Sequence, residues 1–290
     1  MVGRPPVRAL DELSLQVARG EVVGVAGPNG AGKSTLIAVL LGYLHPTSGA
    51  VQLDGVAPRR YIERHGVGYL SELIGINPRW RTDRVLERYA LLAGLSDADV
   101  VRRVDELMEL LGLDEHRTKP VKALSKGNLQ RLGVAQALLG DPDLIILDEP
   151  THGFDPMWTL RFRRVIADLR RPGRTMLIAS HDLAELSALT DRVVILDHGR
   201  VVRTVDTAAK APVLRDYRLT VAAGASEVVA VFPDARAMGD ATFEMRQIEL
   251  DALNVGLAEF LRRGGHIVSV GPSESLLEYH FRDAVEELNP

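Results

Sequence analysis

A glycine-rich stretch near the N-terminus carries the clearest chemistry in the sequence. Residues 27–35 read GPNGAGKST, after an apolar run and before a helical pattern over residues 34–41. In a tight glycine turn between a strand and a helix, several backbone N–H groups converge and form a binding site for an anion. Lys33 can reach the outer phosphates of a nucleotide, and the Ser34 hydroxyl is a candidate Mg²⁺ ligand. The residues expected to hold phosphates are Gly27, Pro28, Asn29, Gly30, Ala31, Gly32, Lys33, Ser34 and Thr35.

Two adjacent carboxylates, Asp148 and Glu149, follow the apolar run of residues 144–147. A continuous apolar run of this length is typical of a strand that is buried on both faces of a parallel sheet. Successive side chains of a strand point to opposite sides, so one carboxylate can help to hold Mg²⁺ while the other faces an attacking water. Such a pair alone is more often a solvated strand end, and the phosphate loop upstream favours the catalytic interpretation.

A polar corner follows another apolar run, at Ser180, His181 and Asp182. Open α/β sheets bind ligands at the carboxyl ends of their strands, so His181 is a candidate site residue. A helix and then a strand hairpin, turned by residues 197–199, are expected after it. We interpret His152 and His198 as ordinary surface or capping residues.

The stretch ALSKGNLQRLGVAQAL, residues 123–138, predicts a helix with an unfavourable beginning. Ser125 is a good N-cap. Lys126 places a positive charge at the positive end of the helix dipole, and Gly127 costs about 0.5 to 1 kcal/mol in backbone entropy. Residues that weaken the helix indicate that something other than its stability requires them.

In their order along the chain, these motifs resemble those of the ATP-binding subunit of an ABC transporter, over residues 1 to about 208. GPNGAGKST is similar to the Walker A loop, LIILDE to the Walker B strand, LSKGN to the signature, THGFDP to the D-loop, and His181 to the switch histidine. The resemblance implies an α/β P-loop NTPase core with an inserted helical subdomain over about residues 77–140. It also implies a small C-terminal α/β domain over residues 209–290.

The resemblance also implies roles for single residues. Lys33 and the loop backbone would hold the phosphates of ATP, Glu149 would polarise water, and His181 would stabilise the γ-phosphate. The expected Mg²⁺ ligands are Ser34, Asp148 and Glu72, the last standing where many relatives have glutamine. Ser125 and Gly127 would act in trans, on ATP held by a second subunit, and Asp155 would couple the two sites.

The signature departs from the usual Leu-Ser-Gly-Gly-Gln, because Lys126 replaces the first glycine and Asn128 the glutamine. The expected contact residues Ser125 and Gly127 are retained. The variant is similar to that of bacterial exporters, in particular drug and multidrug exporters, and therefore favours export over import. The rival interpretations are a soluble ATPase of the same superfamily, for example in iron-sulfur assembly, and a nucleotide sensor that does not hydrolyse ATP.

The expected partners are a second ATPase subunit, as a homodimer, and a separate transmembrane permease. A net charge of −4 and a pI near 6.1 give no reason to expect nucleic acid. No run reaches the roughly 18 apolar residues of a membrane helix. We therefore expect the protein at the cytoplasmic face of the plasma membrane, held there by the permease.

The N-terminus departs from the family pattern, because no aromatic residue that could stack on adenine precedes Tyr43. Either the start is truncated, the alternative that we rank first, or adenine is held loosely or stacks on Arg4 or Arg8. A helical region is expected over residues 77–122, with an amphipathic helix around Leu107, Leu110 and Leu111.

Residues 209–290 carry no chemical motif. Strands are predicted over residues 216–223, 226–233, 241–250 and 264–272. One helix is expected to place on a single face Leu253, Leu257, Phe260 and Leu261. A final helix is expected to pack on the small sheet through Leu277, Phe281, Ala284, Val285 and Leu288. Among dimer support, regulation and simple stability, we favour dimer support as the role of this domain.

Overall fold

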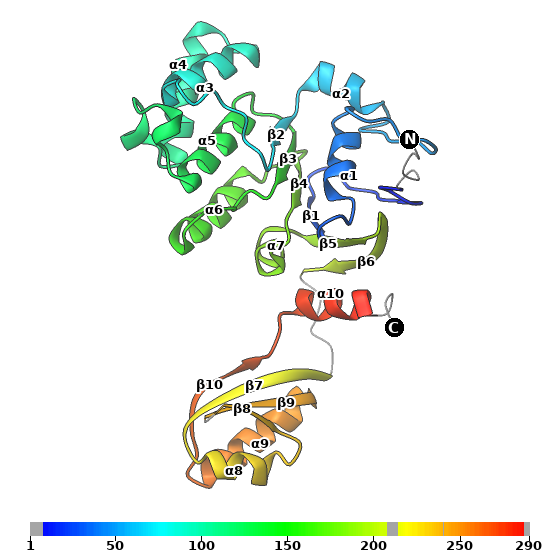
Figure 1. Ribbon diagram of the computed structural model, residues 1–290, viewed down its shortest axis with the longest axis vertical. Coiled ribbons are helices and arrows are strands. Elements are labelled where there is room, and N and C mark those ends of the chain that lie inside the picture. Colours follow the sequence, from blue (N-terminus) through cyan, green and yellow to red (C-terminus); the bar gives the residue numbers. More distant parts are fainter. Residues whose placement is uncertain (1–7, 208–213, 240, 287–290) are drawn as a thin grey trace, which may run out of the picture. The chain divides into compact units, whose positions relative to one another are not determined.

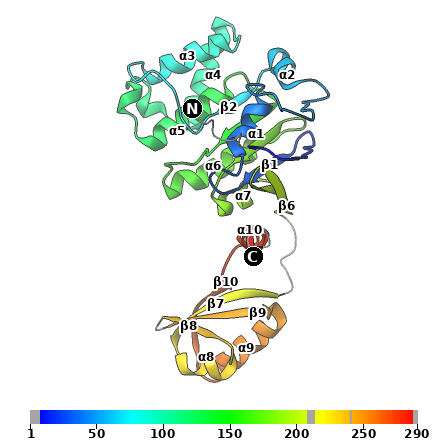
Figure 2. The ribbon, with the colours of Figure 1, turned by 45° about the vertical axis from the view of Figure 1, so that its right-hand side comes forward.

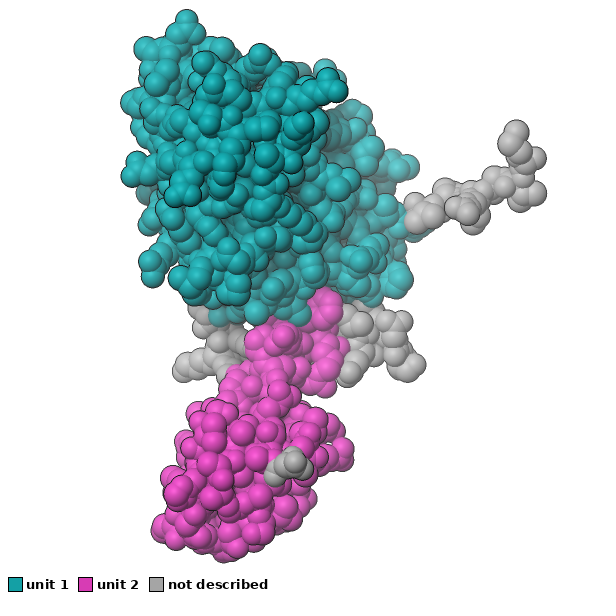
Figure 3. All heavy atoms as spheres, turned by 60° about the vertical axis from the view of Figure 1, so that its left-hand side comes forward, with its two compact units in different colours: residues 1–207 teal, residues 208–290 magenta. Residues whose placement is uncertain are grey.

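The computed structural model describes residues 8–207, 214–239 and 241–286. The chain divides into two compact units, residues 1–207 and 208–290, which Figure 3 shows in different colours. Each unit has a hydrophobic core of its own. Among the described residues, no helix combines the length and the apolar character needed to cross a membrane.

The first unit is built on a six-stranded sheet with the order β2-β3-β4-β1-β5-β6 (Figure 1). All neighbouring strands are parallel except the β5–β6 hairpin. The strands are β1 (Val22–Ala26), β2 (Gly68–Leu70), β3 (Leu144–Asp148), β4 (Thr175–Ala179), β5 (Arg192–Asp197) and β6 (Arg200–Asp206). The middle strands are buried on both faces, as their unbroken apolar sequences predict.

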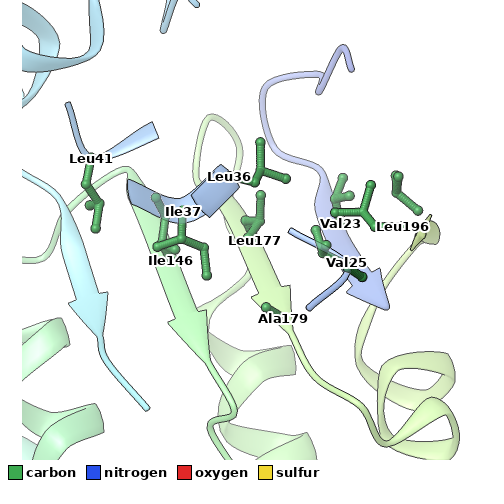
Figure 4. Packing of buried hydrophobic residues seen from close by; sticks show 11 residues of the cluster. Val23, Val25, Leu36, Ile37, Leu41, Ile146, Leu177, Ala179 and Leu196 are labelled. Carbon is green, nitrogen blue, oxygen red and sulfur yellow. The ribbon is translucent and has the colours of Figure 1, made fainter. Parts of the chain in front are cut away.

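Helices cover both faces of this sheet. They are α1 (Lys33–Leu40), α2 (Pro58–His65), α3 (Thr82–Leu92), α4 (Asp97–Leu110), α5 (Lys126–Leu138), α6 (Pro156–Leu169) and α7 (Leu183–Leu189). Figure 4 shows α1 packed through Leu36 and Ile37 on residues of β1, β3 and β4. On the opposite face α7 approaches β1 closely, since a Cβ on Gly24 would lie 3.2 Å from the Leu186 side chain.

The expected helical region contains α3 and α4, followed by two short 3₁₀ turns, Asp114–His116 and Val121–Ala123. The amphipathic pattern of α4 is confirmed: Leu107 is buried, together with Val100 and Val104. Helix α3 packs on α4, and α5 packs on β2 and α3. The sequence therefore predicted this helical layer and its buried face.

The second unit is an antiparallel sheet with the order β10-β7-β9-β8 (Figure 2). Its elements are β7 (Leu214–Ala223), α8 (Ala225–Val231), β8 (Arg236–Gly239), β9 (Thr242–Glu249), α9 (Leu250–Arg262), β10 (His266–Pro272) and α10 (Leu276–Glu286). Helices α8 and α9 pack on one face of the sheet through Val228, Leu253 and Phe260. The predicted mixed α/β composition of this part of the chain is confirmed.

The strand predicted over residues 226–233 is wrong, because these residues form α8. The run of valines favours a strand by intrinsic propensity. Val228 and Phe232 are nevertheless both buried in the core, and their separation of four residues is typical of one face of a helix. Val229, which lies between them in sequence, is 48% exposed. Packing of this face on the sheet overrides the local propensity.

One detail of the predicted helices is wrong. Leu261 is 53% exposed, because it lies about 100° around α9 from the buried Phe260. Helix α10 forms and its Leu277 is buried, although neither Leu277 nor Phe281 belongs to the core cluster that α8 and α9 form with the sheet. In Figures 1 and 2 it lies apart from the face that α8 and α9 already cover. Leu288 lies outside the described residues, and so do the side chains of Ala284 and Val285.

Candidate functional site

The loop between β1 and α1 has the backbone conformation that a phosphate cradle requires. Gly30 and Gly32 have φ angles of 87° and 106°, in the left-handed region that favours glycine. A Cβ on Gly27 would lie 2.5 Å from the Leu196 carbonyl oxygen, and one on Gly32 would lie 2.6 Å from that of Ala9. Neither position has room for a side chain, so the loop depends on both glycines.

Lys33 begins α1 and bends back over the loop. Its Nζ donates hydrogen bonds to the carbonyl oxygens of Gly27, at 2.6 Å, and of Pro28, at 3.2 Å. The ammonium group is thereby held at the loop that would receive phosphate. A phosphate oxygen carries negative charge and a carbonyl oxygen does not, so the ammonium group can exchange these contacts for stronger ones to a nucleotide.

A cavity of about 660 Å³ opens at this loop, which is within the range for small-molecule sites. It brings together most of the site residues predicted from sequence: Asn29, Gly30, Ala31, Gly32, Lys33, Ser34, Thr35, Glu72, Asp148, Glu149 and His181. The sheet explains this, since β1, β3 and β4 end side by side at one edge. Within the part of the chain that the structure describes, the lining of the cavity does not include Ser125, Gly127 or Asp155.

Three carboxylates, those of Glu72, Asp148 and Glu149, border the cavity together with Lys33. Burial, together with the charges of Glu72 and Glu149, raises the pKa of Asp148 to about 6, against an opposing effect of the Lys33 charge. An excess of negative charge beside a hydroxyl, that of Ser34, fits a hard cation with oxygen ligands.

The same carboxylates do not form a finished metal cage. No group of three or more His, Cys, Asp or Glu side chains in the described part of the chain is arranged to hold a metal alone. Mg²⁺ usually takes one or two protein carboxylates, with water and substrate phosphate oxygens as its other ligands. The donor set therefore fits Mg²⁺ that arrives with a nucleotide.

Glu149 is held in an unusual conformation directly after β3. Its φ is +50°, a region that costs a non-glycine residue about 1 to 3 kcal/mol. Its carboxylate accepts the backbone N–H of His181 at 3.0 Å and the Ser180 hydroxyl at 3.1 Å, and it lies 2.9 Å from the His181 Nδ1. Gln130 and the His152 backbone N–H both donate to the Glu149 carbonyl oxygen, at 2.8 Å and 3.2 Å. These contacts together hold a backbone conformation that is costly by itself.

Gln130 is a residue that the sequence reasoning missed. It lies on α5 and is only 4% exposed. A glutamine at an otherwise apolar face of a helix was a usable signal, because a buried amide needs a hydrogen-bond partner.

The start of α5 and the loop before α6 interlock outside the cavity. Ser125 accepts the Asn128 backbone N–H at 3.2 Å, so the predicted N-cap is confirmed. A Cβ on Gly127 would lie 2.7 Å from the Gly153 carbonyl oxygen, which gives this glycine a packing role within one chain. Asp155 caps α6 by accepting the Trp158 N–H at 2.9 Å. Roles of Ser125, Gly127 and Asp155 across a dimer remain predictions.

His152 and His198 are exposed, as the surface interpretation predicts, and both also line the cavity with Arg8 and Ala9. His152 Nε2 also lies 2.6 Å from the Lys126 Nζ. His152 lies in the THGFDP stretch and His198 in the turn at residues 197–199, but the sequence reasoning assigned neither a role, and only the fold brings them to the phosphate loop. Arg4 lies outside the described residues.

Comparison with known proteins adds the family context. Residues 10–152 match the model of the ABC transporter family. The chain is 34% identical over 200 residues to the ABC transporter ATP-binding protein NatA of Bacillus subtilis, covering 68% of this chain and 81% of the relative. It is 37% identical over 217 residues to a methionine import ATP-binding protein of Burkholderia mallei, covering 69% and 52%.

A solved ATP-binding subunit of an ABC transporter has a TM-score of 0.63 and 26% identity to this chain, and covers 86% of it. The match extends over 93% of that structure, which confirms the predicted P-loop NTPase fold. The matched region covers only part of the length of several relatives. It covers 52% of the methionine import protein, and 59%, 61% and 56% of three other ATP-binding proteins.

Proposed function

Because this chain belongs to the ATP-binding subunits of ABC transporters, we propose that it hydrolyses MgATP to drive a separate membrane permease. One observation carries the proposal: a single cavity is lined by the phosphate loop, by the buried pair Asp148 and Glu149, and by His181. These are the groups that phosphoryl transfer to water needs for binding, charge stabilisation and activation of the nucleophile.

Lys33 and the backbone N–H groups of the loop bind and orient the phosphates. Ser34 and Asp148, with Glu72 beside them, would hold Mg²⁺, which neutralises charge on the outer phosphates. Glu149 polarises the attacking water, and His181 stabilises the charge of the γ-phosphate. In the structure both Glu149 carboxylate oxygens are engaged by Ser180 and His181, so water activation requires at least one of these hydrogen bonds to be exchanged.

We infer that hydrolysis occurs in a homodimer. Ser125 and the backbone of Gly127, at the positive end of α5, would complete the site of a second copy, with Asp155 in the loop between the two sites. Support comes from Lys126 and Gly127, since both are poor choices for the first turn of an isolated helix.

The permease would hold the subunit at the cytoplasmic face of the membrane. We propose export as the direction of transport, because the Ser-Lys-Gly signature and Glu72 are similar to those of exporter subunits. The relatives named above include a methionine import protein, so this part of the proposal depends on these two sequence features alone.

The test is hydrolysis by the full chain with and without Mg²⁺, in the wild type and in Glu149→Gln. We expect the wild type to require Mg²⁺, and the variant to bind ATP but to lose at least 100-fold in kcat, since it lacks the carboxylate base. The variant should also accumulate as an ATP-bound dimer in sedimentation. Full hydrolysis by Glu149→Gln would refute the assigned role, and ATP binding without hydrolysis by the wild type would favour a nucleotide sensor.

A further inference from the structure

The tip of the β5–β6 hairpin forms one end of the nucleotide cavity. His198 and Gly199 are the two turn residues, between the paired Asp197 and Arg200. Their φ angles are 45° and 80°, and left-handed values at both positions are typical of a type I′ turn. Asn-Gly or Asp-Gly is the usual sequence of this turn, so turn geometry alone does not explain an imidazole here.

The backbone of this tip is attached to the phosphate loop. Gly199 donates its N–H to the Ala31 carbonyl oxygen at 2.9 Å and accepts the Asp11 N–H at 2.9 Å. A Cβ on Gly199 would lie 2.7 Å from the Ala9 carbonyl oxygen, so the three segments meet without space between them. The position of His198 relative to bound phosphates is therefore fixed, although its side chain is 87% exposed.

The order of the strands places this tip opposite the reacting groups. Strands β3 and β4, which lead to Glu149 and His181, lie on one side of β1, and β5 and β6 lie on the other. A triphosphate on the loop with its γ-phosphate at Glu149 therefore directs its nucleoside to the other side. That end of the cavity is lined by Arg8, Ala9 and His198.

We propose that the His198 imidazole, with the Arg8 guanidinium, is the surface on which the base of the nucleotide stacks. No Phe, Tyr or Trp is among the described residues that line the cavity, and its aromatic rings are those of three histidines. His181 is bound to Glu149 and His152 lies against Lys126. The His198 Nε2 lies 3.9 Å from an Asp197 carboxylate oxygen, but the His198 side chain is 87% exposed, so its ring remains accessible to the base.

Arg8 suits the same role. A guanidinium is planar and stacks on aromatic faces. Asp11 accepts a hydrogen bond from it at 3.0 Å and also binds Arg200, so the carboxylate orients the plane without covering it. Stacking depends little on base identity, so the inferred substrate class is nucleoside triphosphates, with little discrimination between adenine and guanine.

The inference rests on the proposed nucleotide site and is tested with His198→Asn, which suits a left-handed turn but removes the ring. Calorimetry on the full chain with Mg²⁺ would compare adenosine β,γ-imidotriphosphate with inorganic tripolyphosphate, which has no base. We expect the variant to bind the nucleotide analogue roughly 5- to 100-fold more weakly, the range of one lost stacking contact, and tripolyphosphate as the wild type does. His45→Asn, at an exposed histidine that does not line the cavity, is the matched control and should change neither affinity.

Two further measurements sharpen the test. His198→Phe should restore nucleotide affinity to within about threefold, because a phenyl ring also stacks. The guanosine analogue should bind the wild type within about tenfold of the adenosine analogue, and a loss above 100-fold would overturn the stacking assignment in favour of hydrogen-bonded readout.

The inference is also overturned if His198→Asn weakens both ligands equally or neither. Failure of the proposed function has a different result, since a wild type that binds neither tripolyphosphate nor nucleotide overturns the site as a whole.

Discussion

At the scale of single residues, the strained backbone of Glu149 shows why specific neighbours are needed around a reacting group. With its φ of +50°, the buried carboxylate lies at the end of β4, where it accepts hydrogen bonds from Ser180 and His181. Such a backbone is retained only where neighbours determine it. Gln130, whose amide binds the Glu149 carbonyl oxygen, is one of these neighbours.

Gln130→Leu should therefore affect both stability and rate. It removes one of the two donors to the Glu149 carbonyl oxygen, which keeps the His152 N–H at 3.2 Å, and one hydrogen bond contributes about 0.5 to 1.5 kcal/mol net. We expect the free energy of unfolding in urea to fall by that amount, and kcat to fall because Glu149 loses its support. Gln52→Leu, at an exposed glutamine, is the control. An unchanged kcat with a normal loss of stability would show that Gln130 serves only the fold.

The phosphate loop, the carboxylate pair and His181 could be predicted from sequence because each belongs to a short motif whose spacing fixes its local geometry. His198 and Gln130 could not, since their roles depend on the order of the strands and on how α5 packs, which no local pattern encodes.

At the scale of elements, the same distinction separates correct from wrong predictions. The buried strands of the first unit were predicted from unbroken apolar runs, such as that of β3. The helix α8 was missed because its valines favour a strand locally, and only packing of Val228 on the second sheet selects the helix. Tertiary contacts decide where propensity and periodicity disagree.

Helix α7 contains a buried acid with a measurable consequence. Glu185 is only 5% exposed, and this burial raises the pKa of its carboxyl group. A hydrogen bond with Thr151, in the loop before α6, lowers the pKa by a smaller amount, so the net shift is upward. An acid whose pKa is raised on folding contributes stability below its unfolded pKa, near 4.5, and that contribution is lost as pH rises through the folded value.

Glu185→Gln should remove this pH dependence. Relative to the wild type, the free energy of unfolding of the variant should increase from pH 4 to pH 7, since the variant has no buried charge to form. Chemical denaturation across that range measures the difference. A matched change at the exposed Glu63, Glu63→Gln, should show no such trend. A constant difference between wild type and Glu185→Gln would contradict the assigned cause of the shift.

At the scale of the whole molecule, the two hydrophobic cores predict two folding units. The core of the first unit is formed by β1, β3, β4, β5 and α1, and that of the second by its own sheet with α8 and α9. The boundary at Thr207 has structural support, because its hydroxyl donates to the carbonyl oxygens of Thr190, at 2.5 Å, and of Asp191, at 3.0 Å. The first unit therefore ends with its last strand fixed.

A chain that ends at Thr207 should fold and bind nucleotide, because it keeps the complete sheet and every residue that lines the cavity. Thermal unfolding of this shorter chain should be a single cooperative transition. A chain that ends at residue 199 is the informative contrast, since it lacks β6, exposes the edge of β5 and should be unstable or aggregate. If residues 208–290 support the dimer, the shorter chain should need a higher concentration to reach the same hydrolysis per site. Equal rates at all concentrations would instead exclude dimer support as the role of the second unit.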